Sequence, residues 1–269
     1  MGHTQAKRIL ARIADLHHHP ALDKVQNLLL VGEPSSGKTA LLRHYAKAYQ
    51  PAASGQERCA LSWPILSVQL TNGPDEAVLY ETILTVLQSA FAPRANVASK
   101  RHQATQLLHG SGVKLVFLDE LHNLLLGSAL QQRKFLAGLK YLTNELGIPL
   151  VCAGVESARN ALCLDKQLSS RFEVARLPQW SMDVEFRRIL ASFERLLPLE
   201  KPSHLADSAL AFKLLELSHG SIGRLVRILR LAAIEAIRSG AECISLELLQ
   251  AMPLFPLADE GLLDGQVRY

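Results

Sequence analysis

Short apolar runs alternate with amphipathic segments along the chain up to about residue 177. Four of these runs predict strands, at residues 27–31, 63–70, 113–118 and 148–153, and the apolar run at 27–31 predicts a strand buried on both faces. The segments between and before them predict helices at residues 38–49, 75–91 and 128–146, with a turn at 71–74. Strands that alternate with helices form parallel sheets, so the pattern predicts an α/β fold with a parallel sheet flanked by helices.

The hydrophobic pattern changes near residue 180, where the strand signals end. Beyond this point the spacing predicts helices at residues 183–197, 206–218 and 222–239. Before the first strand, Ile9, Ile13 and Leu16 lie on one side of a predicted helix. We therefore expect a helical lead-in at 1–26, a core domain at 27–180 and a small all-helical domain at 181–269.

A glycine-rich segment joins the first predicted strand to the helix that follows it. It matches the P-loop pattern G-x-x-x-x-G-K-[ST] through Gly32, Glu33, Pro34, Ser35, Ser36, Gly37, Lys38 and Thr39. Glycines let the backbone curl so that its N–H groups point at phosphate oxygens, and the helix dipole adds to this attraction. We expect Lys38 to reach the β- and γ-phosphates of ATP and Thr39 to bind Mg²⁺.

A second element of such a site is an acid at the end of a neighbouring strand. The apolar run at 113–118 ends directly at Asp119 and Glu120. Asp119 is expected to hold Mg²⁺, directly or through water, and Glu120 to polarise the attacking water as a general base. The alternative for these two residues is a solvated acidic turn. The paired acid favours ATP hydrolysis over phosphate transfer to a small molecule.

Composition and charge narrow the function classes without selecting one. The 269 residues are 48% hydrophobic and 20% charged, which is ordinary for a folded globular protein. A net charge of +4 permits a nucleic-acid partner but does not require one. Charged residues interrupt the N-terminal segment, and no run approaches the roughly 20 apolar residues that span a bilayer. We therefore expect a cytoplasmic protein with no membrane association.

The P-loop core, the acid pair and the helical C-terminal part together resemble the AAA+ ATPases over about residues 25–250. In that family the nucleotide lies between core and helical lid, and a neighbouring subunit supplies an arginine finger. The resemblance implies that Arg171 is this finger and that Arg224, which opens a lid helix, contacts the γ-phosphate. The alternatives are a surface arginine at 171 and a solvated basic helix face at 224. The family's polar sensor after the fourth strand is missing, because Val155 stands there, although Glu156 follows it.

Several segments further resemble the TniB and TnsC transposition regulators: residues 27–32, 119–123, 147–151 and 221–238. This resemblance implies a homo-oligomer, in the form of a ring or helical filament, that assembles on duplex DNA when ATP is bound. It also implies a DDE-type transposase and a TniQ-like targeting protein as partners, with hydrolysis causing disassembly. The alternatives are a replication-loading ATPase, an IstB-like insertion-sequence helper and an ExeA-like secretion ATPase, because IstB and ExeA share several of these motifs.

Contact with DNA is expected to be independent of sequence and to be made through phosphates. The first candidates are Lys100 and Arg101, in a segment interpreted as a loop before the acid pair. The second are Arg133 and Lys134, near the start of the next predicted helix. Either pair is open to the alternative of an ordinary solvated charge pair.

Overall fold

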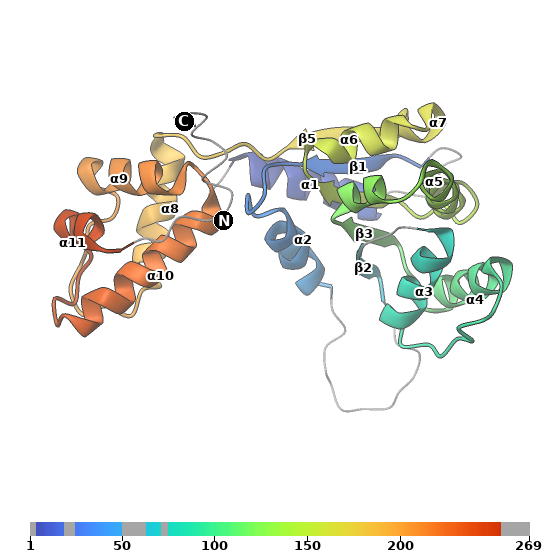
Figure 1. The fold of residues 1–269 in the computed structure, drawn as a ribbon, viewed down its shortest axis with the longest axis horizontal. Coiled ribbons are helices and arrows are strands. Elements are labelled where there is room, and N and C mark those ends of the chain that lie inside the picture. The colour runs from blue at the N-terminus through green and yellow to red at the C-terminus, as the bar shows by residue number, and fades with distance from the viewer. Residues whose placement is uncertain (1–3, 19–24, 50–62, 71–74, 254–269) are drawn as a thin grey trace, which may run out of the picture. The chain divides into compact units, whose positions relative to one another are not determined.

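The computed structural model describes residues 4–18, 25–49, 63–70 and 75–253. The chain divides into two compact units, Met1–Gln179 and Trp180–Tyr269 (Figure 1). The turn expected at 71–74 lies outside the described residues.

A parallel five-stranded sheet forms the centre of the first unit. Its order is β2-β3-β4-β1-β5, with β1 at Asn27–Val31, β2 at Ile65–Gln69, β3 at Leu115–Asp119, β4 at Leu150–Gly154 and β5 at Phe172–Arg176. Four of these strands are those that the apolar runs predict, which confirms the α/β fold with a parallel sheet. The edge strand β5 is additional: it is largely exposed, so it carries no continuous apolar run.

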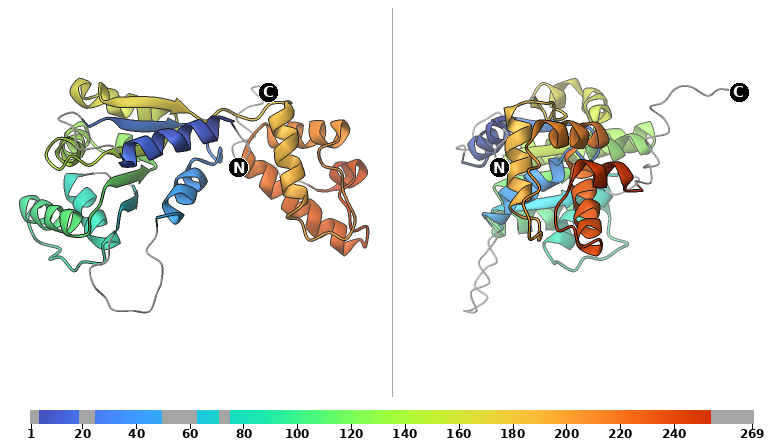
Figure 2. Two further views of the ribbon diagram at one scale, coloured as in Figure 1. Left: turned by 180° about the vertical axis from the view of Figure 1, so that it is seen from behind. Right: turned by 90° about the vertical axis from the view of Figure 1, so that its left-hand side faces the viewer.

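Helices cover both faces of this sheet (Figure 2). On one face α1 (Thr4–His18) and α2 (Lys38–Lys47) pack against Leu28, Leu30 and Phe117. The other face is covered by α3 (Glu76–Val86), α4 (Val97–Gly110), the 3-10 helix η1 (Leu121–Leu126), α5 (Ala129–Asn144) and α6 (Glu156–Cys163). The short helix α7 (Lys166–Ser169) then leads to β5. The lead-in helix thus packs into the core of the first unit.

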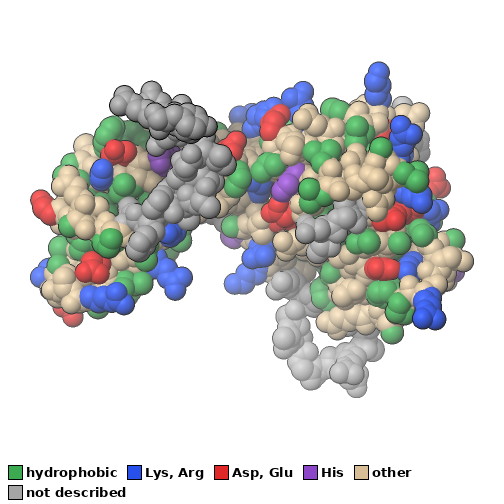
Figure 3. Space-filling view, in the orientation of Figure 1, with side chains coloured by type: hydrophobic (Ala, Val, Ile, Leu, Met, Phe, Trp, Pro, Cys, Tyr) green, Lys and Arg blue, Asp and Glu red, His purple; other side chains and the backbone are tan. Residues whose placement is uncertain are grey.

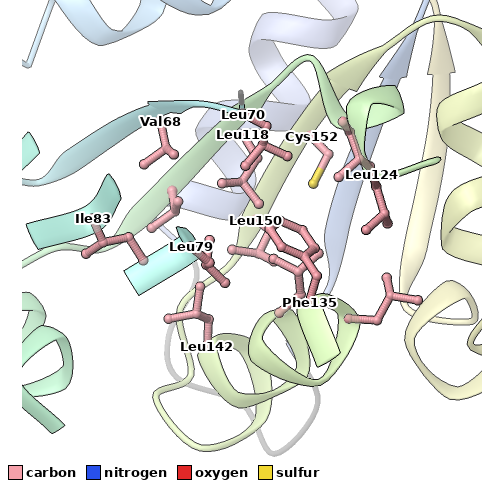
Figure 4. Packing of buried hydrophobic residues seen from close by; sticks show 14 of the residues in the cluster. Val68, Leu70, Leu79, Ile83, Leu118, Leu124, Phe135, Leu142, Leu150 and Cys152 are labelled. Carbon is pink, nitrogen blue, oxygen red and sulfur yellow. The ribbon is translucent and has the colours of Figure 1, made fainter. Parts of the chain in front are cut away.

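The core on the second face is built from alternate strand residues that meet helix side chains. Leu118, Leu150 and Cys152 point from β3 and β4 toward Leu79 and Phe135 (Figure 4), and all five are essentially inaccessible to solvent. Alternate residues of a strand point to opposite faces, so the same strands also supply the core beneath α1 and α2. This two-sided burial explains why β3 and β4 are continuous apolar runs.

Two helix boundaries differ from the expected ones. Helix α3 ends at Val86 instead of near residue 91, because Gln88 adopts a left-handed conformation with φ of 55°. Helix α5 begins after Ser128, whose side chain accepts a hydrogen bond from the Gln131 N–H, while the Gln131 side-chain oxygen accepts one from the Ser128 N–H. This capping box determines where the helix after the acid pair begins.

The second unit is all-helical over its described residues. It contains α8 (Val184–Glu194), α9 (Ser208–Ser218), α10 (Ile222–Arg238) and α11 (Leu246–Ala251), of which α11 was not predicted. Phe186, Leu190, Leu214 and Leu229 form the centre of its separate hydrophobic core. Among the helices that the structure describes, none combines the length and apolar character needed to cross a membrane.

Candidate nucleotide site

The loop between β1 and α2 has the backbone conformation of an anion-binding loop. Ser35 and Gly37 have positive φ angles of 59° and 95°, and α2 begins at Lys38 immediately afterwards. Alternation of left- and right-handed residues aligns successive N–H groups toward one point, and the free N–H groups of the first helical turn add to them. The loop can therefore bind the phosphates of a nucleotide.

The first glycine of the loop is required by close packing. A Cβ atom on Gly32 would lie 2.8 Å from the Ser36 hydroxyl and 3.0 Å from the Leu177 carbonyl oxygen. Leu177 in turn donates its backbone N–H to the Val31 carbonyl at 2.8 Å. Any larger residue at position 32 would displace the backbone that follows β5 or the loop itself.

Lys38 lies folded against the loop that precedes it. Its ammonium group donates hydrogen bonds of 2.8 Å to the backbone carbonyls of Gly32 and Glu33. Burial lowers the pKa of the Lys38 ammonium from its ordinary value, while the carboxylates of Glu120 and Asp119 act in the opposite direction. A buried cation beside an anion-binding loop suits a ligand with several negative charges.

Thr39 and Asp119 meet although 80 residues separate them in sequence. The Thr39 hydroxyl donates a hydrogen bond of 2.6 Å to Asp119 Oδ2. A hydroxyl and a carboxylate beside a phosphate-binding loop fit Mg²⁺, which uses few protein oxygens and completes its octahedron with water and phosphate. Among the described residues, no group of three or more His, Cys, Asp or Glu side chains is placed to hold a metal ion.

Glu120 occupies a constrained position at the end of β3. Its backbone is left-handed with φ of 61°, and its N–H donates to Asp119 Oδ1 at 2.9 Å. Its carboxylate lies 3.2 Å from Nε2 of His122. The sequence interpretation missed this histidine, although its position two residues after the predicted general base was a usable signal. The contact places His122 where it can orient the Glu120 carboxylate.

We expect His122→Ala to lower kcat for ATP hydrolysis about tenfold, which is the effect of losing one orienting hydrogen bond. The KM for ATP should change little, because no phosphate contact is removed. Steady-state hydrolysis assays of His122→Ala and His122→Gln, with the exposed His109→Ala as control, test this. A raised KM with an unchanged kcat would mean that His122 acts in nucleotide binding instead.

The end of β4 does not supply the missing polar sensor from its own residues. Val155 is the N-cap of α6 and has no polar side-chain atom. The Glu156 carboxylate forms ion pairs with Arg176 and Arg159, and its hydrogen bond from Arg176 lowers the pKa of Glu156 below its ordinary value. Glu156 is thus engaged with neighbouring arginines, and it is His122 that lies against Gly154 at the strand end.

Arg171 lies at the opposite end of the sheet from the phosphate loop. It precedes β5, and its carbonyl accepts a hydrogen bond of 2.8 Å from the N–H of Asn27, the first residue of β1. The loop leaves the other end of β1, about 15 Å away at the rise of a β-strand. The guanidinium group donates to the Asn144 side chain. Arg171 therefore does not reach the nucleotide site of its own chain.

Three other residues with predicted contacts lie on helices. Arg224 lies in the first turn of α10 in the second unit and is half-buried. Arg133 and Lys134 are exposed on α5. Their predicted contacts, with the γ-phosphate and with DNA respectively, stay predictions.

The placement of Lys100 and Arg101 in a loop is wrong, because both lie in α4. Lys100 is buried and forms a 2.5 Å ion pair with Glu81. Arg101 pairs with Glu76 and stacks over the Tyr141 ring at 5.1 Å. These contacts connect α4 with α3 and α5. They also neutralise the two positive charges that would otherwise attract a DNA phosphate. The sequence interpretation missed them because the acidic partners lie about 20 residues away.

Comparison with known proteins agrees with this geometry. The family model for the bacterial TniB protein matches residues 1–182. Among proteins with curated descriptions, none matches this chain in sequence.

Solved structures share the fold at low sequence identity. The Aeropyrum pernix ORC2 protein, in ADPNP-ADP complexes, is 19% identical with a TM-score of 0.67, over 91% of this chain and 66% of that one. Pyrobaculum aerophilum Cdc6p is 17% identical with a TM-score of 0.66, over 97% and 69%. The Aeropyrum pernix ORC1 protein in complex with DNA is 19% identical with a TM-score of 0.65, over 92% and 63%. The chain thus spans just under two thirds of the length of both ORC proteins. Because the TniB match covers more than half of the 269 residues, the chain belongs to the TniB family, and its fold is that of the AAA+ ATPases.

Proposed function

We propose that this TniB-family ATPase regulates transposition by assembling on duplex DNA in its ATP-bound form. Copies of the chain join head to tail, a contact that produces rings or open helical filaments. The assembly recruits a DDE-type transposase, with a TniQ-like targeting protein as a further partner, and hydrolysis of ATP disassembles it. Two findings support a regulator that acts on DNA: the match to the TniB family model, and the similarity of the fold to that of an ORC1 protein in complex with DNA.

The position of Arg171 is the observation that carries this proposal. A phosphoryl-transfer site needs positive charge beside the anionic γ-phosphate in the transition state, and Lys38 is the loop residue that supplies part of it. Arg171 lies at the far end of the sheet from Lys38, and this position supports a role at the site of another copy of the chain. An active site divided between copies makes hydrolysis depend on assembly, and assembly depend on nucleotide.

Within one site the residues have separate tasks. The loop N–H groups and Lys38 would bind the β- and γ-phosphates, while Thr39 and Asp119 would hold Mg²⁺, whose positive charge would neutralise charge on the phosphate oxygens. Glu120 accepts a proton from the attacking water, and His122 keeps its carboxylate in position. The partner subunit's Arg171 stabilises the charge of the transferring group, and Arg224 contacts the γ-phosphate.

Contact with DNA is assigned to Arg133 and Lys134. Both are exposed on α5, whereas the ion pairs of Lys100 and Arg101 remove those two residues from consideration. Adjacent cations attract any phosphate backbone through release of its counterions, without reading base sequence.

Electron microscopy of the protein on random-sequence duplex DNA tests the proposal, with ATP, a slowly hydrolysed analogue and ADP compared. Ordered rings or filaments are expected with ATP or the analogue, and none with ADP or with Lys38→Ala. The absence of nucleotide-dependent assembly on DNA would refute the proposed mechanism. The alternatives would then be favoured: an ATPase for replication loading, an insertion-sequence helper or a secretion ATPase.

A paired charge reversal tests the assigned DNA contact. Arg133→Glu combined with Lys134→Glu should weaken DNA binding. It should also make the slope of log affinity against log salt concentration shallower, by the amount expected for the loss of about two phosphate contacts. The matched control is Arg187→Glu with Arg188→Glu, an adjacent exposed pair on α8. Equal weakening by both pairs would mean that net charge, and not this surface, determines the affinity.

A further inference from the structure

Helix α10 has a second hydrophobic face that the core of its unit does not use. Its buried side packs into that core through Leu225, Ile228, Leu229 and Ala232. The opposite side carries four aliphatic residues with exposed fractions between 36% and 45%, and two exposed arginines. We call this set the α10 outer face: Val226, Arg230, Leu231, Ile234, Ile237 and Arg238.

The members of the α10 outer face are neighbours on the helix surface. Val226, Arg230 and Ile234 follow one another at four-residue steps, and Ile237 and Arg238 continue the row. The one acidic residue of α10, Glu235, lies at the margin of this face. Space-filling representation shows basic and hydrophobic side chains interspersed on the visible side of this unit (Figure 3).

Such a face selects its partner by chemistry. Exposed aliphatic side chains in a contiguous patch are stabilised by an apolar surface, and the arginines between them by carboxylates. A nucleic-acid backbone offers anions but no aliphatic groups, so it leaves Val226, Ile234 and Ile237 unburied. The matching partner is a peptide segment that combines apolar and acidic residues.

A segment of this composition belongs to the chain itself. Residues 254–269 contain the carboxylates of Asp259, Glu260 and Asp264 against the single cation of Arg268. Six apolar residues accompany them: Leu254, Phe255, Leu257, Leu262, Leu263 and Val267. The segment follows α11, which packs against α9 and α10. Sixteen residues can span about 50 Å, while α10 is about 25 Å long, so the whole α10 outer face is within reach.

We propose that residues 254–269 bind the α10 outer face of their own chain. The apolar residues of the segment cover Val226, Ile234 and Ile237, and its carboxylates pair with Arg230 and Arg238. Tethering supports this choice over a separate partner, because a short linker gives an effective concentration in the millimolar range. The proposal concerns the second unit alone and does not depend on the proposed role in transposition.

Disulfide trapping in the full chain tests the contact. The four native cysteines are replaced by alanine, and Ile234→Cys is combined with Leu263→Cys in dilute protein under a glutathione buffer. We expect an intramolecular disulfide that forms about fivefold faster than one between Leu263→Cys and Phe212→Cys. Phe212 is an exposed position on α9 and serves as the control.

Charge exchange makes the test specific to the pairs. Arg230→Glu with Arg238→Glu should slow the Ile234–Leu263 linkage about fivefold, and adding Asp259→Arg with Asp264→Arg should restore it. Equal rates for the Ile234 and Phe212 linkages would overturn the proposal, as would failure of the exchange to restore the rate. A linkage found between two copies, and not within one, would assign the face to a second copy and also overturn it.

Discussion

Arg171→Ala is expected to lower the rate of ATP hydrolysis on DNA by about 10³-fold, the lower end of the effect of removing an arginine that stabilises the transferring phosphoryl group. The reason is electrostatic, because charge that develops on the γ-phosphate loses a fixed cation in a site of low dielectric constant. Affinity for ATP should fall much less, because Arg171 lies about 15 Å from the loop of its own chain at the rise of a β-strand. Hydrolysis and nucleotide-binding assays on the same preparation measure both effects.

Mixing two inactive variants shows whether Arg171 contributes to the ATPase site of another copy or to the site of its own chain. Arg171→Ala and Glu120→Gln, which still binds ATP, are each expected to be nearly inactive, yet a one-to-one mixture should recover about a quarter of the sites, where an intact Glu120 meets an intact arginine. Recovery of no activity would contradict the divided site. Asn144→Ala is the control, since it removes the hydrogen-bond partner of Arg171 and keeps the arginine. If it were as inactive as Arg171→Ala, local structure would explain the loss.

Glu120→Gln is expected to slow hydrolysis by about 10²- to 10⁴-fold while ATP still binds. Glutamine keeps the shape of the side chain but cannot accept the proton of the attacking water. The substitution leaves in place the proposed phosphate contacts of Lys38 and the hydrogen bond between Thr39 and Asp119. Single-turnover hydrolysis, measured beside equilibrium binding of ATP, distinguishes these two effects.

The same variant also probes the link between hydrolysis and disassembly. Assemblies of Glu120→Gln on DNA with ATP should last as long as those of the unaltered protein with the slowly hydrolysed analogue. Glu145→Gln, an exposed carboxylate after α5, is the matched control and should behave as the unaltered protein. Rapid disassembly of Glu120→Gln would show that release does not require hydrolysis.

The sequence by itself determined the elements that depend on local chemistry. Four strands were predicted from apolar runs, and every position of β1 and β4 is buried because helices or strands cover both faces of these strands. The P-loop was predicted because its glycines and its lysine serve a backbone geometry that spans only eight residues. The helical second unit followed from helical spacing in the same way. These signals lie within one element or at one junction.

The tertiary structure decided everything that depends on which segments become neighbours. It brought Thr39 and Asp119 to 2.6 Å and added the exposed edge strand β5. It buried Lys100 in an ion pair, where charge alone favoured a solvated loop. It also placed Arg171 beside the start of β1, at the end of the sheet away from the loop. Sheet order and strand register fix these distances, and no local pattern encodes them, because each depends on segments tens of residues apart.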